Sequence, residues 1–549
     1  MDSRCGSVVA LPLELLSTIF SQIPPSSLTA VCLTCHAFRN VAAGILYKNL
    51  YLPWNFMSGL KLPVIENVMT SSDFALSKIK RLEIVPDNSV YPGILRNPSN
   101  RGLKGAEDLL LRLILHRLQP GQLRSVSLSL AGGISTETAV FLMKTQPNLK
   151  HIDLSTNTRP REPGYGDLLS CKSVSSGIES FGFYIGRFEE AVSIPFAFIH
   201  NVLRDNCRTL KSLYISFDKK SELFNELEND LMNPQIDQTL TARILQHFAR
   251  SPNNEKELIE FPSLNQLRIR SFPKFSAICK LANPPLLSRF HWSNIKTLRI
   301  DDCSGADGLL LDIAGKMPNL RVLQIQMSCS WDTLEEILPK LAPLEVLHVI
   351  FSVDGEAPGE TAFEVLNSHR HTLRSLWIEY DSDHRLMDDA ISHIISTGPH
   401  PLCQRHWPKL EQLSLQLIDD YAVFYPMENL RYLRILHPPD FDHRSLEHET
   451  KLVKQLCESL LQATLRDGRL PTLQVVAVMV YDQVPKNPHT ALFPAYFVVE
   501  FVKTLLGDWT VLLSPGSHHD IRRLFPDITM MEFERGERLW DSNDGRILS

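Results

Sequence analysis

Residues 295–349 contain three copies of one short pattern, IKTLRI at 295–300, LRVLQI at 320–325 and LEVLHV at 344–349. Each copy reads apolar, two variable residues, apolar, one variable residue, apolar. The last part of the pattern alternates as a β-strand with one buried face does. The copies begin at residues 295, 320 and 344, a spacing typical of a repeat that adds one strand per unit.

The same pattern continues on both sides of this stretch, from residue 79 to residue 478. The intervals are uneven, because Leu210 and Leu264, and Leu430 and Leu473, are separated by long segments without a copy. The remaining clear copies are LRSVSL (123–128), LKHIDL (149–154), LKSLYI (210–215), LNQLRI (264–269), LRSLWI (373–378), LEQLSL (410–415) and LRYLRI (430–435), and the weaker ones are IKRLEI (79–84), IESFGF (178–183) and LQVVAV (473–478).

Segments with an apolar helical face lie between several of these strands. Examples are TETAVFLMK (136–144), DGLLLDIAGKM (307–317), DTLEEILPKL (332–341) and DDAISHIIS (388–396). One strand and one helix cannot bury their apolar faces alone, whereas stacked copies can. The sequence therefore favours an array in which the strands form a parallel sheet.

The repeated unit resembles the leucine-rich repeat, L-x-x-L-x-L-x-x-N/C. Asn157 and Cys303 occupy the last position of that pattern, but most copies have another residue there. The resemblance implies an irregular α/β solenoid, a horseshoe with parallel strands on its concave side. The alternative is a set of unrelated strand–helix units in one α/β sheet, and thirteen copies with Leu or Ile almost always in front favour the solenoid.

Residues 11–52 have a different pattern, with three short amphipathic segments in place of a strand. Pro12 and Glu14 suit the first turn of a helix. We expect Pro24-Pro25 to end this helix, Ser26 or Ser27 to cap the second, and residues 47–52 to form a strand that leads into the array. A core of about forty residues is marginal alone, and it would gain stability by burying its remaining apolar face against a partner.

The string LPLELLSTIFSQIPPSSLTAVCLTCHAFRNVAAGILYKNLYL (11–52) resembles the F-box family. It has the Leu-Pro-x-Glu opening, the Ile-Phe pair and the Cys-x-x-Phe-Arg segment, with Phe38 where the family usually has Trp. The resemblance implies docking on the Skp adaptor of a cullin–RING ubiquitin ligase. The residues that it suggests for the adaptor-binding surface and its support are Leu11, Pro12, Leu15, Leu16, Ile19, Phe20, Leu28, Val31, Cys35 and Phe38.

These patterns predict four parts of the chain. Residues 1–10 are expected to be disordered, 11–52 to form the F-box and 53–482 to form the repeat solenoid. Residues 483–549 are expected to form a C-terminal cap, beginning with a helix and then a strand. Loop insertions are expected at 87–104, at 156–176 and at 219–260, the last of them as a charged helix pair or loop without strands.

The array would hold a protein substrate near the ubiquitin carrier, and the variable positions of the strands would face it. Tyr, Trp and Arg dominate the binding energy of many protein interfaces. We therefore expect substrate contacts, if the concave face makes them, at Tyr214, Arg268, Arg299, Trp377 and Arg434. The alternative is that these are ordinary solvated strand positions.

Composition excludes several other classes. The net charge is −6 without a dense Lys/Arg run, so a nucleic-acid partner is not expected. No stretch approaches 18 uninterrupted apolar residues, so no membrane partner is expected. The ten cysteines are scattered, which favours reduced thiols in the cytoplasm, the nucleus or both.

No pattern indicates an enzyme or a cofactor. The Cys32–His36 string fits the C-x-x-C-H of covalent haem attachment, but it lies in a predicted helix of the F-box. His437, His443 and His448 read as an exposed loop, as does His518-His519, and neither predicts a metal site. Phosphate-binding glycine loops and hydrolase motifs do not occur. A scaffold whose N-terminal helices only cap the array and an enzyme with an unrecognised site remain as alternatives to the substrate receptor.

Overall fold

The computed structural model describes the fold in segments. They are residues 11–23, 25–55, 59–60, 66, 68–86, 104–128, 136–156, 177–185, 201–217, 250–251, 254–258, 260–271, 290–303, 305–326, 329–352, 360–381, 406–416, 427–436, 472–482, 491–503 and 509–516. Within these segments, no helix is both long and apolar enough to span a bilayer. The expected disordered residues 1–10 and helix 388–396 lie outside them.

Three helices open the described chain: α2 (Leu13–Ser21), α3 (Pro25–Val31) and α4 (His36–Leu46). Pro12 takes the position before α2 and Glu14 its first turn, as expected. The expected capping of the second helix by Ser26 or Ser27 is wrong, because α3 already begins at Pro25. Proline suits the first position of a helix, where its missing N–H would have no partner in any case.

The chain divides into two compact units. The first comprises Met1–Glu226 and Arg243–Ser263, and the second Leu227–Ala242 and Leu264–Ser549. In the first unit β1 pairs with β2 in antiparallel and with β3 in parallel fashion, and β3 to β7 follow as parallel neighbours. Its strands are β1 (Asn49–Asn55), β2 (Gly59–Leu60), β3 (Arg81–Pro86), β4 (Ser125–Leu128), β5 (His151–Thr156), β6 (Ser180–Ile185) and β7 (Ser212–Phe217), and its further helices are α6 (Asp73–Ser77), α7 (Lys104–Arg117) and α8 (Thr136–Thr145).

The second unit has a longer sheet, in which β10 to β17 are parallel neighbours. The strands are β10 (Gln266–Arg270), β11 (Thr297–Asp301), β12 (Val322–Gln326), β13 (Val346–Ser352), β14 (Ser375–Asp381), β15 (Gln412–Gln416), β16 (Tyr432–Leu436) and β17 (Val475–Asp482). Its helices are α14 (Ala306–Ile313) and α15 (Trp331–Ile337), with 3₁₀ turns η5 (Trp292–Asn294), η6 (Ala314–Lys316), η7 (Leu338–Lys340) and η8 (Glu360–Ser368).

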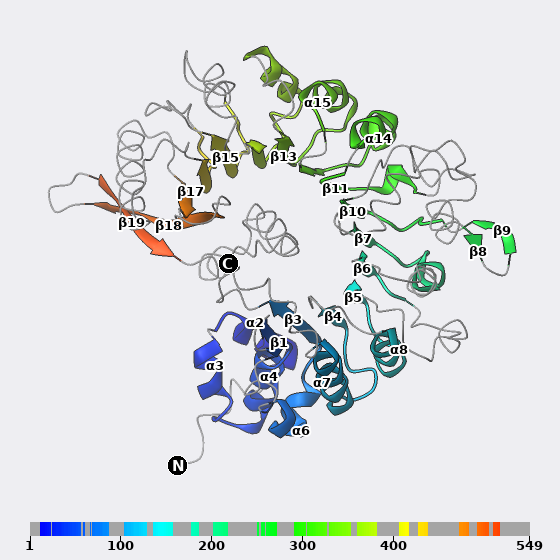
Figure 1. The fold of residues 1–549 in the computed structure, drawn as a ribbon. Helices are drawn as coiled ribbons and strands as arrows, with labels where there is room; N and C mark the ends of the chain where they lie inside the picture. The colour runs from blue at the N-terminus through cyan, green and yellow to red at the C-terminus, as the bar shows by residue number, and fades with distance from the viewer. Residues whose placement is uncertain are drawn as a thin grey trace. The chain divides into compact units, whose positions relative to one another are not determined.

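The apolar positions of the repeated pattern form the core of each unit. In the copy at 320–325, Leu320, Leu323 and Ile325 are all buried. Helices α14 and α15 follow β11 and β12 and lie on one side of their strands (Figure 1). The predicted fold class, three N-terminal helices followed by a solenoid-like region of mostly parallel strands, is confirmed.

Two elements differ from expectation. Part of the 219–260 insertion is an antiparallel strand pair, β8 (Arg250–Ser251) with β9 (Asn254–Leu258), where no strand was expected. The expected helix near residues 491–503 is instead β18 (Ala491–Lys503), which pairs antiparallel with β17 and with β19 (Trp509–Gly516). The β-branched and aromatic residues of FVVEFV favour a strand. The cap role of 483–549 stays a prediction.

Polar side chains that precede the strands join successive repeats. The residue directly before the leading apolar residue donates a hydrogen bond to a backbone carbonyl of the preceding repeat, as Asn319 Nδ2 does to Ser293 O at 2.7 Å. The same link is made by Gln122, Asn148, Thr209, Ser263, Thr372, Asn429 and Thr472. Asn or Cys at the last position of the repeat pattern can form a ladder of polar contacts between repeats, and most copies here have another residue at that position. The hydrogen bonds from the residues before the strands provide polar contacts between repeats in its place. Cys303 still makes the ladder contact, since its Sγ lies 3.8 Å from Ile269 O.

A second, buried link precedes β7. Asn206 Oδ1 accepts hydrogen bonds from the backbone N–H groups of Gly177 and Ile178, both at 2.8 Å, and Nδ2 donates to Val202 O at 2.9 Å. We expect Asn206→Ala to cost roughly 2–4 kcal/mol in the free energy of unfolding, because two backbone donors lose their partner. The exposed Asn319→Ala should cost about 1 kcal/mol or less. Urea denaturation of both variants measures the difference, and equal losses would contradict it.

Candidate functional site

A row of polar side chains crosses the second unit on one face of the sheet, one residue per strand. We call it the polar row. Its members are neighbours in register from β10 to β16: Arg268, Arg299, Gln324, His348, Trp377, Ser414 and Arg434. They alternate along each strand with the apolar residues of the core, so the sequence pattern itself places them on the opposite face.

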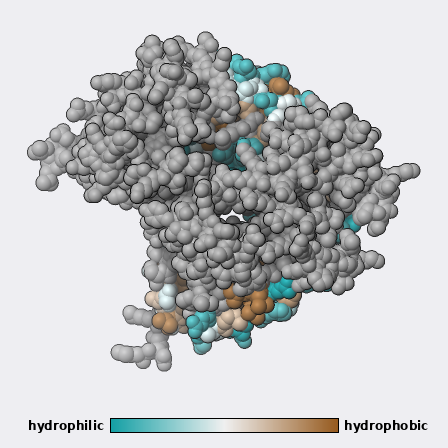
Figure 2. Space-filling model, in the orientation of Figure 1, coloured by the Kyte–Doolittle hydropathy of each residue, from teal (hydrophilic) through white to brown (hydrophobic). Residues whose placement is uncertain are grey.

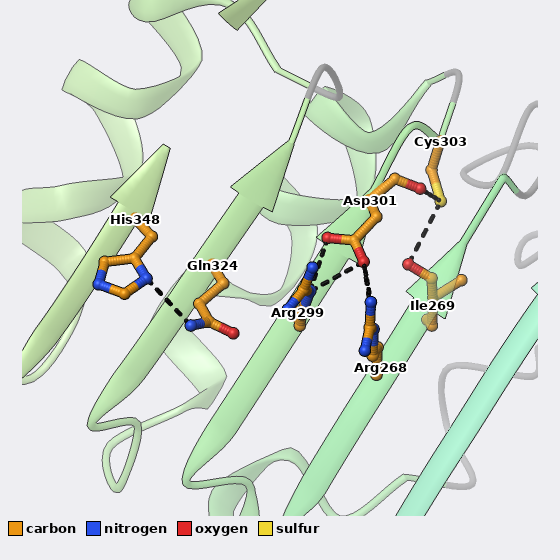
Figure 3. A network of polar contacts seen from close by, with 7 residues as sticks. All are labelled: Arg268, Ile269, Arg299, Asp301, Cys303, Gln324 and His348. Atoms are coloured by element: carbon orange, nitrogen blue, oxygen red, sulfur yellow. Dashed lines mark hydrogen bonds and ion pairs between the residues drawn. The ribbon is translucent and has the colours of Figure 1, made fainter. Parts of the chain in front are cut away.

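Asp301 organises the first end of the polar row (Figure 3). Its carboxylate accepts from Arg268 Nε and Nη2 at 3.1 and 3.0 Å, and from Arg299 Nε at 2.9 and 2.8 Å. Burial alone would raise the pKa of the Asp301 carboxyl, but the positive charges of Arg299, Arg268 and Arg270 hold it below its usual range. The carboxylate is therefore ionised, and it fixes two guanidinium groups in place.

His348 lies at the middle of a chain of hydrogen bonds. Gln324 Nε2 donates to His348 Nδ1 at 3.1 Å, so the ring proton lies on Nε2, which donates to Ser375 Oγ at 2.7 Å. Burial, together with the nearby charges of Arg299 and Arg434, lowers the pKa of His348 to about 3. The imidazole is therefore neutral and structural at any ordinary pH.

At the other end of the polar row, the side chains of Arg434 and Trp377 stack on one another. The Arg434 guanidinium lies 3.9 Å from the centre of the Trp377 ring. Glu379 Oε2 accepts from Trp377 Nε1 and from Arg434 Nη1, both at 2.7 Å, and Arg434 Nη1 also donates to Ser414 Oγ at 3.1 Å. Trp377 and Arg434 are buried, so their contacts within the chain hold this end together.

The structure thus separates the five residues expected to contact a substrate. Arg299, Trp377 and Arg434 are buried, so they are not the solvated strand positions of the alternative reading, whereas Arg268 and Tyr214 are partly exposed. In the first unit, Tyr214 shares its register row with Gly182 and Asp153. A Cβ atom at Gly182 would lie 2.8 Å from Asp153 Oδ1 and 3.4 Å from Tyr214 Cδ1, so a larger residue there would require the Asp153 carboxylate to move. Substrate contact by any of the five stays a prediction.

We expect His348 to make folding sensitive to pH. The folded protein binds a proton at His348 only near pH 3, whereas the unfolded chain binds one below about 6.5. Stability is therefore full above about pH 6.5 and declines as the pH falls, by up to about 1.4 kcal/mol per unit. His348→Gln should flatten the dependence of the urea midpoint on pH between 7 and 5. Parallel curves for wild type and variant would contradict this assignment.

The three N-terminal helices have a core of their own. Leu16 and Phe20 from α2, Leu28 from α3 and Ala42 from α4 are buried together. The ring of Phe38 meets that of Phe20 edge-on, with 5.1 Å between centres and 86° between planes. The same helices also carry apolar side chains that are not part of this core and are exposed.

The exposed apolar side chains include Leu15 and Ile19, which lie one turn apart on α2 and are 51% and 48% exposed. Leu13 and Leu33 are also exposed in the same helical module. Figure 2 shows apolar side chains at the surface of the lower part of the view, where Figure 1 places α2 to α4 together with α6 and α7. Grouped exposed apolar residues mark an interaction surface more often than scattered ones do.

Comparison with known families identifies this module. Residues 8–53 match the family described as F-box-like. These residues form an F-box-like domain. Such a domain indicates an adaptor-type role in ubiquitin ligation, with a Skp-like adaptor as partner.

Other comparisons add little about function. No curated protein sequence matches the chain. Among solved structures, the chain is similar to one from the crystal structure of the Rad7 and Elc1 complex in yeast, with 16% identity and a TM-score of 0.36. The alignment covers 79% of this chain and 91% of that one. That score is too low to relate the functions of the two proteins.

The F-box-like domain separates the ten residues expected at the adaptor surface. Leu15 and Ile19 are exposed with Pro12, whereas the others are buried or partly buried: Leu16, Phe20 and Leu28 fully, and Leu11, Val31, Cys35 and Phe38 in part. The helical stripe read from the sequence therefore mixes the core of the domain with its outer surface. Leu13 and Leu33 are exposed as well but were not among the ten, because they lie outside that stripe. A role in adaptor binding stays a prediction for all of them.

The F-box-like domain continues into the following strands of the first unit without a linker. After α4 the chain forms β1, and the N–H groups of Lys80 and Arg81 both donate to Lys48 O, at 2.8 and 3.0 Å. The guanidinium of Arg39 on α4 lies 5.3 Å from the centre of the Phe74 ring on α6. The domain is thus fixed to the first strands by backbone and side-chain contacts.

Neither a metal site nor a cofactor site is apparent in the parts of the chain that the structure describes. No group of three or more His, Cys, Asp or Glu side chains is placed there to hold an ion. In the C-x-x-C-H string, Cys32 packs against the core of the F-box-like domain and Cys35 takes the N-cap position of α4. His437, His443, His448, His518 and His519 lie outside the described residues.

Proposed function

We propose that this chain is the substrate receptor of a Skp–cullin–F-box ubiquitin ligase. The F-box-like domain binds the Skp adaptor, which brings the cullin and RING subunits, and the repeat region, which we propose consists of leucine-rich repeats, binds a protein to be ubiquitinated. The observation that carries the proposal is the pair Leu15 and Ile19, exposed on a domain whose own core is already complete. An N-terminal cap needs one apolar face, whereas an adaptor-docking domain needs two.

The proposed receptor forms no bond itself. It raises the local concentration of a substrate lysine near the charged ubiquitin carrier. Such a mechanism requires a fixed distance between the adaptor and the substrate. The backbone hydrogen bonds from Lys80 and Arg81 to Lys48 favour this, because they tie the F-box-like domain to the first strands.

The competing function is a scaffold whose N-terminal helices only cover the end of the array. Capture of a purified Skp adaptor by the full chain distinguishes the two. We expect a stable complex, on which the cullin–RING core then assembles. A folded chain that captures no adaptor would leave the scaffold as the better explanation. The variants that locate the binding surface are described in the Discussion.

A further inference from the structure

The residues directly before the parallel strands of the first unit form a row of neighbours. The backbone N–H of each donates to the carbonyl of the one before it, as Lys80 does to Lys48 O and Arg124 to Lys80 O, both at 2.8 Å. We call these residues the entry row. Its members, in order from β1 to β7, are Lys48, Lys80, Arg124, Lys150, Glu179 and Lys211.

Neighbouring side chains of the entry row are close enough to form ion pairs. Glu179 lies between two lysines, with Oε1 3.4 Å from Lys150 Nζ and Oε2 2.7 Å from Lys211 Nζ. The residues directly before the strands of the second unit form the same kind of pair, Arg321 with Glu345 and Arg374 with Glu411. Where such a row alternates in charge, the chain therefore compensates its own charges.

The first three members of the entry row do not alternate. Lys48, Lys80 and Arg124 are exposed and follow one another without an acid between them. Within the described residues, none of these three side chains forms an ion pair or a hydrogen bond. Neighbouring strands lie about 4.8 Å apart, so the three positive charges lie along about 10 Å of the sheet. Like charges on neighbouring strands destabilise a sheet, and a sequence that breaks such a rule often does so at a functional site.

Two more cations extend this charge toward the F-box-like domain. Arg39 Cζ and Lys78 Nζ lie 5.3 and 4.8 Å from the centre of the same ring, that of Phe74. The ring attracts both cations but has no net charge with which to neutralise them. Lys78 stands two residues before Lys80 in the chain. We call Arg39, Lys48, Lys78, Lys80 and Arg124 the basic surface, and its formal charge is +5.

The elements around the basic surface offer little negative charge. Among α4, α6, β1, β3 and β4, which carry or adjoin its residues, the acidic side chains are those of Asp73 and Glu83. Asp73 pairs with Arg117 at 3.5 Å, and Glu83 pairs with Arg81 at 3.0 Å. Both acids thus have a cation of their own, and the charge of the basic surface is left for an external anion.

We propose that the basic surface binds an acidic segment, rich in Asp or Glu, of a protein partner. This goes beyond the proposed function and rests on it only for the expectation that the ligand is a protein. Arg39 and Lys48 lie within the residues that match the F-box-like family, whereas Lys80 and Arg124 precede strands of the repeat region. The surface therefore joins the two parts of the chain to which the proposed function assigns protein partners.

The small extent of the basic surface favours a protein segment over a nucleic acid or a membrane. The uncompensated part of the entry row ends at Lys150, which pairs with Glu179. Tight binding to DNA uses on the order of 6–10 phosphate contacts. The chain as a whole has a net charge of −6, which repels a long polyanion and an anionic bilayer alike. A short segment with a few carboxylates is attracted by the local charge and extends little beyond it.

Fluorescence anisotropy with the purified full chain tests the inference. The probe is a fluorescein-labelled peptide of alternating Glu and Gly, and its control has Gln in place of Glu. We expect the Glu peptide to bind, the Gln peptide not to bind, and added salt to weaken binding, because salt screens exposed charges. No binding of the Glu peptide by wild type would overturn the inference.

Substitutions then locate the binding. Lys80→Gln should weaken binding of the Glu peptide about twofold to fivefold, as expected for one exposed ion pair. Lys48→Gln/Lys80→Gln/Arg124→Gln should weaken it about tenfold or more. The matched control is Lys296→Gln, because Lys296 is exposed at the equivalent position before β11. It should bind the peptide as wild type does. Equal affinities of the triple variant and wild type, or an equal loss in Lys80→Gln and Lys296→Gln, would contradict the proposed location.

Unfolding in urea distinguishes a binding surface from a structural one. Removal of one of three adjacent like charges should leave the urea midpoint unchanged or raise it, whereas loss of a structural contact would lower it. A lower midpoint for Lys80→Gln than for Lys296→Gln would therefore count against the inference.

Other polyanions and the adaptor complete the test. Tighter binding of a labelled single-stranded oligonucleotide, or of vesicles that contain phosphatidylserine, would overturn the inference and assign a nucleic acid or a membrane surface instead. Adaptor capture is measured on the same samples. A chain that binds the peptide and not the adaptor refutes the ligase role alone, and a chain that captures the adaptor and not the peptide refutes only the acidic ligand.

Discussion

Leu15→Asp/Ile19→Asp is expected to abolish capture of the Skp adaptor by an otherwise folded chain. Both side chains are about half exposed, so in the free protein the two carboxylates stay in water. At an interface they would replace apolar contacts worth about 1.5–3 kcal/mol each and would also have to be desolvated. The expected loss of affinity is therefore about a hundredfold or more.

The structure supplies a closely matched control for this variant. Leu109 and Leu113 are likewise one turn apart and exposed, but on α7. Leu109→Asp/Leu113→Asp introduces the same chemistry outside the F-box-like domain and should leave capture unchanged. Phe20 is a poor choice for such a test, because it is buried in the core of the domain, and aspartate there would unfold it.

Pull-down and calorimetric titration with purified adaptor measure the effect, and circular dichroism confirms folding. Unchanged capture by Leu15→Asp/Ile19→Asp would show that this surface is not the docking site. Equal loss in the α7 variant would mean that charge or aggregation, and not the location of the substitutions, causes the effect.

Asp301→Ala is expected to lower the free energy of unfolding by about 3–5 kcal/mol, the cost of removing one partner from a buried ion pair. Asp301 is fully buried between Arg268 and Arg299. Without it, the positive charges on β10 and β11 repel one another in a region that water screens poorly. Asp301→Asn keeps the shape of the side chain but removes its charge. It should therefore recover only a small part of the free energy of unfolding that Asp301→Ala loses.

Glu345→Ala provides the comparison, because Glu345 pairs with Arg321 at an exposed position. Exposed ion pairs contribute about 1 kcal/mol or less. Urea denaturation of the three variants should therefore rank Asp301→Ala as the least stable and Glu345→Ala as close to wild type. Equal stability of Asp301→Asn and wild type would show that the charge of Asp301 does not stabilise the fold.

Short periodic patterns in the sequence were sufficient to predict the strands of the repeats. Copies such as LRVLQI at 320–325 place one apolar residue in the entry turn and two on the inner side of the strand, and β12 follows this pattern. The three helices of the F-box-like domain were predictable for the same reason, since Pro12, Glu14 and the apolar stripe of α2 act within a few residues of one another.

Longer-range contacts decided other parts of the fold. Residues 491–503 were expected to form a helix, but they form β18, whose strand partners on both sides satisfy the backbone donors and acceptors. The links made by Asn319 and similar residues were missed because each joins residues of two repeats that lie 21 to 55 positions apart in the sequence. In the sequence these links correspond to a polar residue directly before the leading Leu or Ile. That residue indicates a hydrogen bond between repeats only when the stacking of the repeats is known.

The sequence by itself determined the order of elements and which residues face each side of a strand, because both follow from periodicity along the chain. It also identified the residue types of the polar row. Only the tertiary structure decided that Arg299, Trp377 and Arg434 are buried while Arg268 is accessible, and that Leu15 and Ile19 stay outside the core that Leu16 and Phe20 complete. Burial depends on what neighbouring strands and helices place around a side chain, and periodicity carries no information about those neighbours.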